Sequence, residues 1–379
     1  MRLGRFWTTA TAAAPCLWFA GFTNAETAAV RVTFGDQRRQ QAAGGAADAS
    51  RSREGQASPP LPRGGGKKST TATLELQNDG VPDVLVGPTC GPSALYNRTI
   101  DPSRYQFGCT EIEGMITGPK TLITSGNSRK VFLVKYEGVE LVLKTTKHQS
   151  AKTSKRHHME AIALDVVLGA PYIAPSLGFC QTSSVQPYFV GGTVEEHIGK
   201  AAWTGEPFGV EAVLQMSLDA MRGLAAFHEA PGGPIIHNAM RPEQLLVYDN
   251  GTVVVSDLNS CNFMGAEEGT GARCPTKSHI HHNARWNAPE LYGHEGYTEK
   301  IDIFSMGIIF WQLMSLRTIP FEGWPTKSVP DLVKTGQRPH VDDSWDPGYA
   351  QLMQDMWAMV PEARPSAREV AARLEEMRG

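Results

Sequence analysis

The chain lacks a strong overall charge. Its 36 Lys and Arg residues nearly balance its 39 Asp and Glu residues, which gives a formal net charge of −3. Long-range attraction to nucleic acid or to an anionic membrane needs a strong charge of one sign. The sequence therefore gives no whole-molecule argument for either partner, and we expect no nucleic-acid ligand.

Long apolar runs are also missing after the first 25 residues. No later run approaches the ~18 apolar residues that a membrane span needs, so we expect no transmembrane segment. At the start of the chain, Arg2 and Arg5 precede an apolar stretch that ends in small residues near Ala25. This pattern is typical of a secretory signal peptide over residues 1–25, with an uncleaved apolar leader on a cytosolic protein as the alternative.

Large apolar residues are scarce in the next segment, residues 26–78, which is rich in Gly, Ala, Arg, Ser, Pro and Gln. Such a segment cannot bury enough apolar surface to offset the entropy lost on ordering. We therefore predict a disordered linker or pro-region there, followed by a folded domain over residues 79–379.

Cysteine is uncommon, with 6 residues in the chain. Removing the leader removes Cys16 and leaves an odd number, of which most should pair in an oxidising compartment. Short separations within irregular segments favour two disulfides and one free thiol, Cys180, in the apolar context LGFC. The predicted disulfides are Cys90–Cys109 and Cys261–Cys274.

Two N-x-[ST] sequons accompany the predicted secretory route. They are NRT at Asn97 and NGT at Asn250. Both are candidate glycosylation sites on the surface of a secreted protein.

The hydrophobic pattern changes along the domain. Residues 121–126, 129–138, 139–146 and 187–192 read as short β-rich runs, and a helical pattern interrupts them at 154–169. Residues 208–230 and 301–379 read as amphipathic helices. We predict an α+β, bilobal fold, with a small β-rich lobe at about 79–190 and a larger helical lobe at about 191–379.

Six motifs stand in a characteristic order along this domain. They are VLK ending at Lys144, HHMEAIAL around Glu160, VVVSDLNS around Asp257, NAPEL around Glu290, KIDIFSMGIIFWQL around Asp302, and PEARPSAREV around Arg364. Over residues 121–377 this ordered set resembles the protein-kinase family. The resemblance implies a bilobal kinase fold with a nucleotide cleft between its lobes.

The resemblance assigns structural roles to four residues. Glu290 and Arg364 match a buried ion pair of the helical lobe, and Asp302 matches the residue that holds the catalytic-loop backbone. His237 matches a residue that packs and forms hydrogen bonds, so we give it no catalytic part. Breaking such a buried pair by removing one partner typically costs ~3–5 kcal/mol.

The stretch IIHNAMRPEQLLV departs from the kinase catalytic loop H-R-D-L-x-x-x-N. Asn238 stands at the Arg position, Ala239 at the Asp position and Gln244 at the Asn position. A positioned general base is worth ~10²–10⁴ in rate, and the Ala239 methyl group accepts no proton. We expect Glu243 to point away from the site, as its counterpart does in the family, so we predict no catalytic residues.

The phosphate-binding and metal-binding motifs are altered as well. TSGNSRKV keeps Gly126 but puts Thr124 and Arg129 at the other glycine positions, which keeps backbone away from phosphates. Arg129 is either a free surface residue, which we favour, or contacts a phosphate itself. Asn259 replaces the Gly that follows Asp257, a possible magnesium ligand.

A vestigial nucleotide pocket is therefore predicted at Gly126, Lys144, Glu160 and Asp257. The resemblance pairs Lys144 with Glu160, either to clamp phosphates or, as we favour, to fix the helix to the sheet. We expect weak or absent binding of ATP and Mg²⁺, and hence no cofactor.

The activation segment, residues 257–290, lacks its usual phosphate partner because Asn238 replaces the Arg. Its hydroxyl residues Thr270, Thr276 and Ser278 would gain nothing from that partner on phosphorylation. The cluster His279, His281 and His282 fits no standard zinc spacing, so solvated histidines are favoured over a metal site.

A secreted, kinase-like chain with a folded extension before its first strand resembles the rhoptry-kinase family of apicomplexan parasites, which contains many pseudokinases. The resemblance implies an inactive protein that binds, scaffolds or allosterically regulates a protein partner, such as an active kinase or a matrix component. Its expected location is a secretory organelle, then the parasitophorous vacuole or cyst wall. Two alternatives stay open: an atypical or residual ATP-dependent phosphotransferase, and a structural matrix component.

Overall fold

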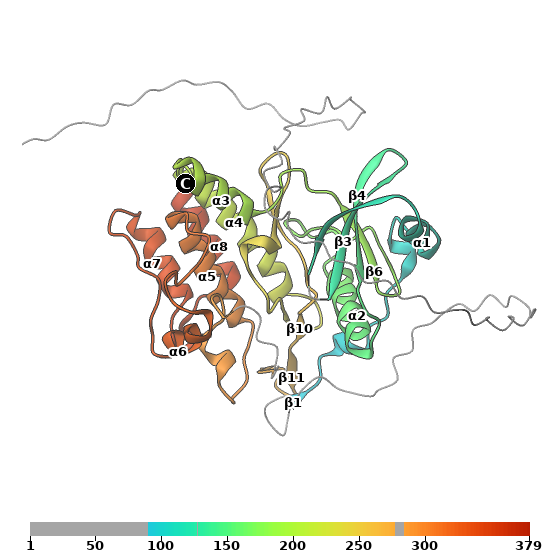
Figure 1. Ribbon diagram of the computed structural model, residues 1–379. Helices are drawn as coiled ribbons and strands as arrows, with labels where there is room; N and C mark the ends of the chain where they lie inside the picture. The colour runs from blue at the N-terminus through green and yellow to red at the C-terminus, as the bar shows by residue number, and fades with distance from the viewer. Residues whose placement is uncertain (1–89, 127, 277–283) are drawn as a thin grey trace, which may run out of the picture. The chain divides into compact units, whose positions relative to one another are not determined.

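The computed structural model describes residues 90–126, 128–276 and 284–379 (Figure 1). These residues belong to one compact unit of the chain. The predicted signal peptide and linker, Ser278 and the three clustered histidines lie outside the described residues.

The first lobe is built on a five-stranded antiparallel sheet with the strand order β2-β3-β4-β6-β5. The strands are β2 (Lys120–Ser125), β3 (Arg129–Tyr136), β4 (Val139–Thr146), β5 (Gly178–Cys180) and β6 (Ser183–Pro187). Glu137 and Gly138 both have positive φ and connect β3 to β4, as a two-residue hairpin turn requires. The hairpin fixes the register that brings Lys144 opposite Val131.

Helix α2 (Ala151–Val166) packs beside this sheet and forms the predicted helix at 154–169. Ser150 caps its N-terminus and exchanges hydrogen bonds with Thr153. Met159 and Ile162 are buried in the main core, and Glu160 is also buried. A charged residue on the buried face of a helix needs a partner.

The β-rich run predicted at 187–192 is wrong in position, because the strand β6 ends at Pro187. Pro187 offers no N–H to extend a ladder. Gly191 lies so close to the Val247 carbonyl that an added Cβ would sit 2.4 Å from its oxygen. This close approach fits a connection between the lobes rather than a strand.

The second lobe is helical. It contains α3 (Val194–Thr204), α4 (Val210–His228), α5 (Lys300–Ser315), α6 (Val329–Lys334), α7 (Pro347–Met356) and α8 (Ala367–Arg378). Every residue of α5 from Ile301 to Leu313 is buried, so the amphipathic pattern predicted over 301–379 is wrong for this helix, which is surrounded on all sides. The predicted α+β, bilobal fold is confirmed.

Short strands form three further small sheets in the described structure. They are β7 (Ile235–Ile236), paired with β10 (Asn262–Phe263), and β8 (Leu245–Val247), paired with β9 (Val253–Val255). A third small sheet joins β1 (Cys90–Gly91), β11 (Gly265–Glu267) and β12 (Arg273–Cys274). Within the described ranges, none of the helices has both the length and the apolarity to cross a membrane.

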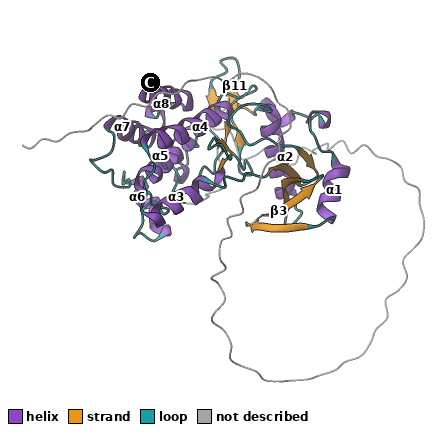
Figure 2. Cartoon of the chain, turned by 90° about the horizontal axis from the view of Figure 1, so that it is seen from above, coloured by secondary structure: helices purple, strands orange, loops and turns teal. Residues whose placement is uncertain are grey.

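A folded extension precedes β2, as predicted. It contains β1, two short 3₁₀ turns (Ala94–Asn97 and Pro102–Arg104) and helix α1 (Cys109–Thr117), which lies beside the sheet (Figure 2). The Phe107 N–H donates to the Leu177 carbonyl at 2.9 Å, just before β5. The later part of the extension, residues 107–117, therefore packs on the first lobe.

The predicted disulfide pairing is wrong. The structure joins Cys109 to Cys180 and Cys90 to Cys274, and Cys261 is a buried free thiol whose pKa is raised by burial. The bonded residues are 71 and 184 positions apart, so short sequence separation was a poor guide. The reason is the extension, which carries Cys109 to the sheet edge at β5 and Cys90 to the activation segment.

Both sequon residues are exposed. Asn97 ends the first 3₁₀ turn, and Asn250 lies in the β8–β9 turn, where its Oδ1 accepts from the Thr252 N–H at 3.0 Å. Their glycosylation stays a prediction.

Candidate functional site

A cavity of about 760 Å³ lies between the sheet, α2 and the loops of the helical lobe. Its lining includes Gly126 and Lys144 from the sheet, Ala239 and Gln244 from the loop after β7, and Asp257 after β9. The structure thus brings together residues that are more than a hundred positions apart in the sequence. Glu160 lies behind this wall, fully buried.

Glu160 forms its ion pair with Arg129, not with Lys144 as expected. Arg129 is 8% exposed, which corrects the expectation of a free surface residue. One Arg129 Nη also lies 3.2 Å from His157 Nδ1, one turn before Glu160 on α2. The first residue of β3 therefore reaches across to α2 and fixes the helix to the sheet.

Arg129, which replaces Lys144 as the ion-pair partner of Glu160, also affects the pKa values of the neighbouring groups. Burial alone would raise the pKa of Glu160, but the charges of Arg129 and Lys144 outweigh it and hold that pKa below its usual value. Burial lowers the pKa of His157 to about 4, and the nearby Glu160 opposes this shift only in part. His157 is therefore neutral at pH 7.

Lys144 faces the cavity without an ion pair among the described residues, and it is 8% exposed. Sequence reasoning placed Arg129 at the third glycine position but did not anticipate that it would displace Lys144 from Glu160. The sequence did contain an indication of this contact, because a long basic side chain on the first residue of a strand can reach the neighbouring helix. Whether the Arg129 side chain turns that way depends on tertiary packing.

The loop after β7 presents Ala239 to the cavity, where a methyl group offers neither donor nor acceptor. With its amide turned so that both ends find a partner, Gln244 donates to Asp257 Oδ2 at 3.2 Å and accepts from Arg241 at 3.0 Å. One Asp257 oxygen is thus already engaged, which reduces its capacity to bind a cation. The Ser260 hydroxyl similarly donates to Asn259 Oδ1 at 2.8 Å.

Glu243 lines the cavity, contrary to the expectation that it points away. It forms an ion pair with Arg241 at 2.8 Å, and its other carboxylate oxygen is buried without a hydrogen bond in the described structure. Glu243 is the middle residue of the 3₁₀ turn Pro242–Gln244.

Asp302, on α5, holds the backbone of this loop. Its Oδ2 accepts from the His237 N–H at 2.7 Å and its Oδ1 from the Asn238 N–H at 2.8 Å. His228 Nε2 lies 3.1 Å from the same carboxylate, and His237 Nε2 donates to the Ser256 carbonyl at 2.8 Å. Asp302 and His237 thus occupy the structural roles that the resemblance implies. Asn238 has φ +64°, so these two hydrogen bonds stabilise an uncommon backbone conformation.

Glu290 and Arg364 form the bidentate ion pair that the resemblance implies. The two nitrogen–oxygen distances are 2.5 and 2.8 Å. The remaining donors of Arg364 reach the carbonyls of Ala358 and Lys300, and its guanidinium lies 5.1 Å from the Phe304 ring centroid. Every charge in this cluster is therefore compensated.

The hydroxyl residues of the described activation segment differ in exposure and in their contacts. Thr270 is exposed and donates to the Glu267 carboxylate at 2.6 Å, whereas Thr276 is buried and pairs with Tyr297 through two backbone hydrogen bonds. Asn238 Nδ2 donates to the Ser260 carbonyl at 3.2 Å. Among the described residues, no cluster of three or more His, Cys, Asp or Glu is placed to hold a metal ion.

Comparison with known proteins finds similarity to protein kinases. Residues 118–374 match the family described as protein tyrosine and serine/threonine kinase. The chain is 26% identical over 257 residues to the serine/threonine/tyrosine-protein kinase HT1 of Arabidopsis thaliana, covering 65% of this chain and 62% of that protein.

Two further relatives match a smaller share of this chain. Identity is 27% over 200 residues to the serine/threonine-protein kinase STY46 of Arabidopsis thaliana, which is 51% of this chain and 31% of that protein. Identity is 32% over 162 residues to mitogen-activated protein kinase kinase kinase 7 of Homo sapiens, which is 41% of this chain and 25% of that protein. The chain thus spans less than two thirds of each of these relatives.

Proposed function

Since the chain belongs to the protein tyrosine and serine/threonine kinase family, we propose that it is a pseudokinase, an inactive member that binds, scaffolds or allosterically regulates a protein partner. The observation that carries the proposal is Ala239 in the cavity wall. At this position the family places the Asp that accepts the substrate proton. A methyl group there costs the ~10²–10⁴ in rate that a positioned base supplies.

The neighbouring contacts support the same proposal. Phosphoryl transfer depends mainly on positioning and on Mg²⁺ that neutralises developing charge. Gln244 engages one oxygen of Asp257, the remaining metal ligand of the motif. Arg129 replaces a glycine of the phosphate loop and is committed to Glu160. These changes disfavour the binding of ATP with Mg²⁺.

The retained contacts support a binding role. Asp302 and the Glu290–Arg364 pair keep the loops of the helical lobe in place, although these loops serve no chemistry under our proposal. A rigid scaffold that presents surface loops is what a scaffolding or allosteric protein needs. The partner we propose is a protein, either an active kinase or a matrix component, and affinity capture from the native compartment would identify it.

A thermal-shift titration tests the nucleotide part. We expect a Kd for ATP above ~100 μM, and therefore a gain in unfolding free energy of less than ~0.4 kcal/mol with Mg²⁺ and ATP at about 100 μM. A second arm replaces Mg²⁺ with a chelator, and a Lys144→Ala variant serves as the matched control. A Mg²⁺-dependent shift that disappears in the Lys144→Ala variant would contradict the proposal, since ligand at 100 times Kd stabilises by ~2.7 kcal/mol.

We also propose that the protein is secreted and belongs to the rhoptry-kinase branch, acting in the parasitophorous vacuole or cyst wall. The two disulfides support the secretory part, because such bonds persist in oxidising compartments. Mass analysis of the mature N-terminus tests it: we expect cleavage near Ala25. A mature chain that retains residues 1–25, with reduced cysteines, would contradict secretion.

An atypical phosphotransferase is the second candidate, and the position of Glu243 favours it. This carboxylate lines the same cavity as Ala239, Lys144 and Asp257 and is therefore a candidate for the base that Ala239 cannot supply. A radiolabel transfer assay decides between the two functions. Activity that is lost in Glu243→Gln would establish the enzyme, whereas no activity in either protein supports the pseudokinase.

A further inference from the structure

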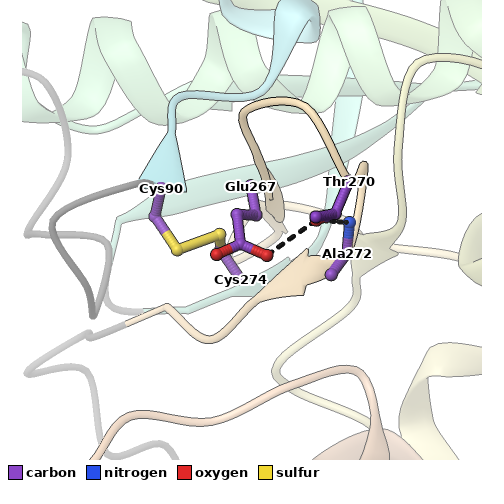
Figure 3. The surroundings of a disulfide bond; sticks show 5 residues. All are labelled: Cys90, Glu267, Thr270, Ala272 and Cys274. Carbon is purple, nitrogen blue, oxygen red and sulfur yellow. Dashed lines mark hydrogen bonds between the residues drawn. A yellow bond between two sulfur atoms is a disulfide. The ribbon is translucent and has the colours of Figure 1, made fainter.

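A disulfide joins the extension to the activation segment (Figure 3). Strands β11 and β12 form a hairpin within that segment, and β1 pairs with β11, with Cys90 opposite Glu267. The bond from Cys90 to Cys274 therefore connects the two outer strands of a three-stranded sheet. Their Cα atoms are 6.0 Å apart, although outer strands of a flat sheet lie ~10 Å apart, so the sheet is strongly curled.

The residues after β1 continue this contact. The Ser93 hydroxyl donates to the Gly232 carbonyl at 3.3 Å, and the Tyr96 hydroxyl lies 3.4 Å from both the N–H and the carbonyl of Phe263. The Tyr96 and Phe263 rings also pack, with centroids 5.1 Å apart. The extension thus touches the activation segment at β10 as well as at β11 and β12.

The same stretch of chain then reaches helix α2. Asp165, buried at the end of α2, accepts from Arg98 at 3.0 Å, from Arg104 at 2.8 Å and from the Tyr105 hydroxyl at 2.9 Å. We call residues 90–105 the strap, since they connect the activation segment to α2. These are the two elements whose positions depend on phosphorylation in regulated kinases.

Among the described residues, the two positions that would support a phosphate on this segment are unsuited to it. Asn238, which stands where such a phosphate finds its Arg partner, donates instead to the Ser260 carbonyl. Thr270, the exposed hydroxyl of the hairpin, lies against the Glu267 carboxylate, which would repel a phosphate. The contacts that the structure does give the segment are those with β1 and the disulfide.

We propose that the Cys90–Cys274 disulfide takes the place of a phosphorylated residue, so that the thiol–disulfide state of the strap sets the order of the activation segment. In the reducing direction a dithiol supplies two electrons and two protons. It becomes a disulfide and leaves Cys90 and Cys274 as two thiols. Cys90 is partly exposed, so a reductant can reach the bond. The inference holds whether or not the cavity binds nucleotide.

Hydrogen exchange measured by mass spectrometry tests the proposal. In the full chain carrying Cys90→Ser and Cys274→Ser, amides of residues 258–276 should exchange at least ~10-fold faster, with α5 and β3 unchanged. The matched control carries Cys109→Ser and Cys180→Ser, which removes the other disulfide, and should leave residues 258–276 protected. Unchanged protection in the first variant, or equal loss in both, would overturn the proposal.

If the first variant fails to fold, titration of the wild-type protein with a dithiol decides the matter. Loss of protection in residues 258–276 should follow the appearance of free Cys90 and Cys274 thiols, and the proposal is wrong if it follows those of Cys109 and Cys180. In a folded variant, adding Thr270→Glu should not restore protection. Restoration would show that a negative charge can replace the bond, contrary to the proposal.

Discussion

The two lobes each contain a buried Arg–Glu pair, and the pairs differ in how completely they are satisfied. In the helical lobe, Arg364 donates hydrogen bonds to Glu290 and to backbone carbonyls. In the sheet lobe, Arg129 holds Glu160 but leaves one Nη buried without a hydrogen bond in the described structure. A buried pair is stabilising only when its remaining donors and acceptors are also paired. The Arg364–Glu290 pair therefore serves only the fold. The Arg129–Glu160 pair lies beside the cavity and leaves a buried donor unpaired in the described structure.

The largest effect is expected from Arg364→Ala. This change leaves Glu290 buried without its cation and removes the donors for two carbonyls, so unfolding free energy should fall by ~3–5 kcal/mol. Urea denaturation measures it. The matched control is Arg317→Ala at the exposed pair with Glu322, where we expect a change within ~0.5 kcal/mol. Equal effects of the two changes would refute the distinction between buried and exposed pairs.

Acid should destabilise the sheet lobe through His157. Its folded-state pKa of about 4 lies below the ordinary value of 6.5, so the unfolded chain binds a proton first as pH falls. The stability from this residue is complete above about pH 6.5 and declines between 6.5 and about 4, by an amount on the order of 2–3 kcal/mol. In His157→Asn this part of the pH dependence should disappear. The same slope in both proteins would exclude His157 as its source.

A smaller effect is expected from Arg129→Ala, about 1–3 kcal/mol, because Lys144 is near enough to act electrostatically on Glu160 and can take over as its cation. Lys144→Ala alone should cost less than about 1 kcal/mol, since Lys144 forms no ion pair with any described residue. The double variant should then lose more than the sum of the single changes. Additivity in this double-mutant cycle would show that Lys144 does not substitute for Arg129.

The smallest effect is expected from restoring the catalytic Asp. Ala239→Asp should give no measurable phosphoryl transfer, because residues that act as one unit are strongly non-additive and the phosphate and metal contacts stay altered. A radiolabel assay compares it with a variant that combines Asn238→Arg, Ala239→Asp, Gln244→Asn and Asn259→Gly. Activity in the single variant would mean that the cavity already positions ATP. If neither variant is active, the defect lies in the phosphate loop at Arg129.

Several features were predictable because they depend on local or ordered patterns. Periodicity gave α4 to within two residues at each end, and the motif order led to the bilobal fold. Glu290, Arg364 and Asp302 could be assigned roles because their partners are set by the arrangement of helices that the motifs imply. The strand expected at 187–192 failed, since apolar residues and glycines occur in a connection as readily as beside a strand.

By itself the sequence determined the chemical inventory of the site: no carboxylate at Ala239, a glutamine at position 244, and a single glycine left in the phosphate loop. Tertiary structure alone decided which groups meet. It turned Arg129 toward Glu160, brought Glu243 to the cavity, and joined Cys90 to Cys274 across 184 residues. The physical reason is that residue identity fixes what a side chain can donate, accept or bond. Its partner depends on distant segments whose approach is set by the packing of the whole domain.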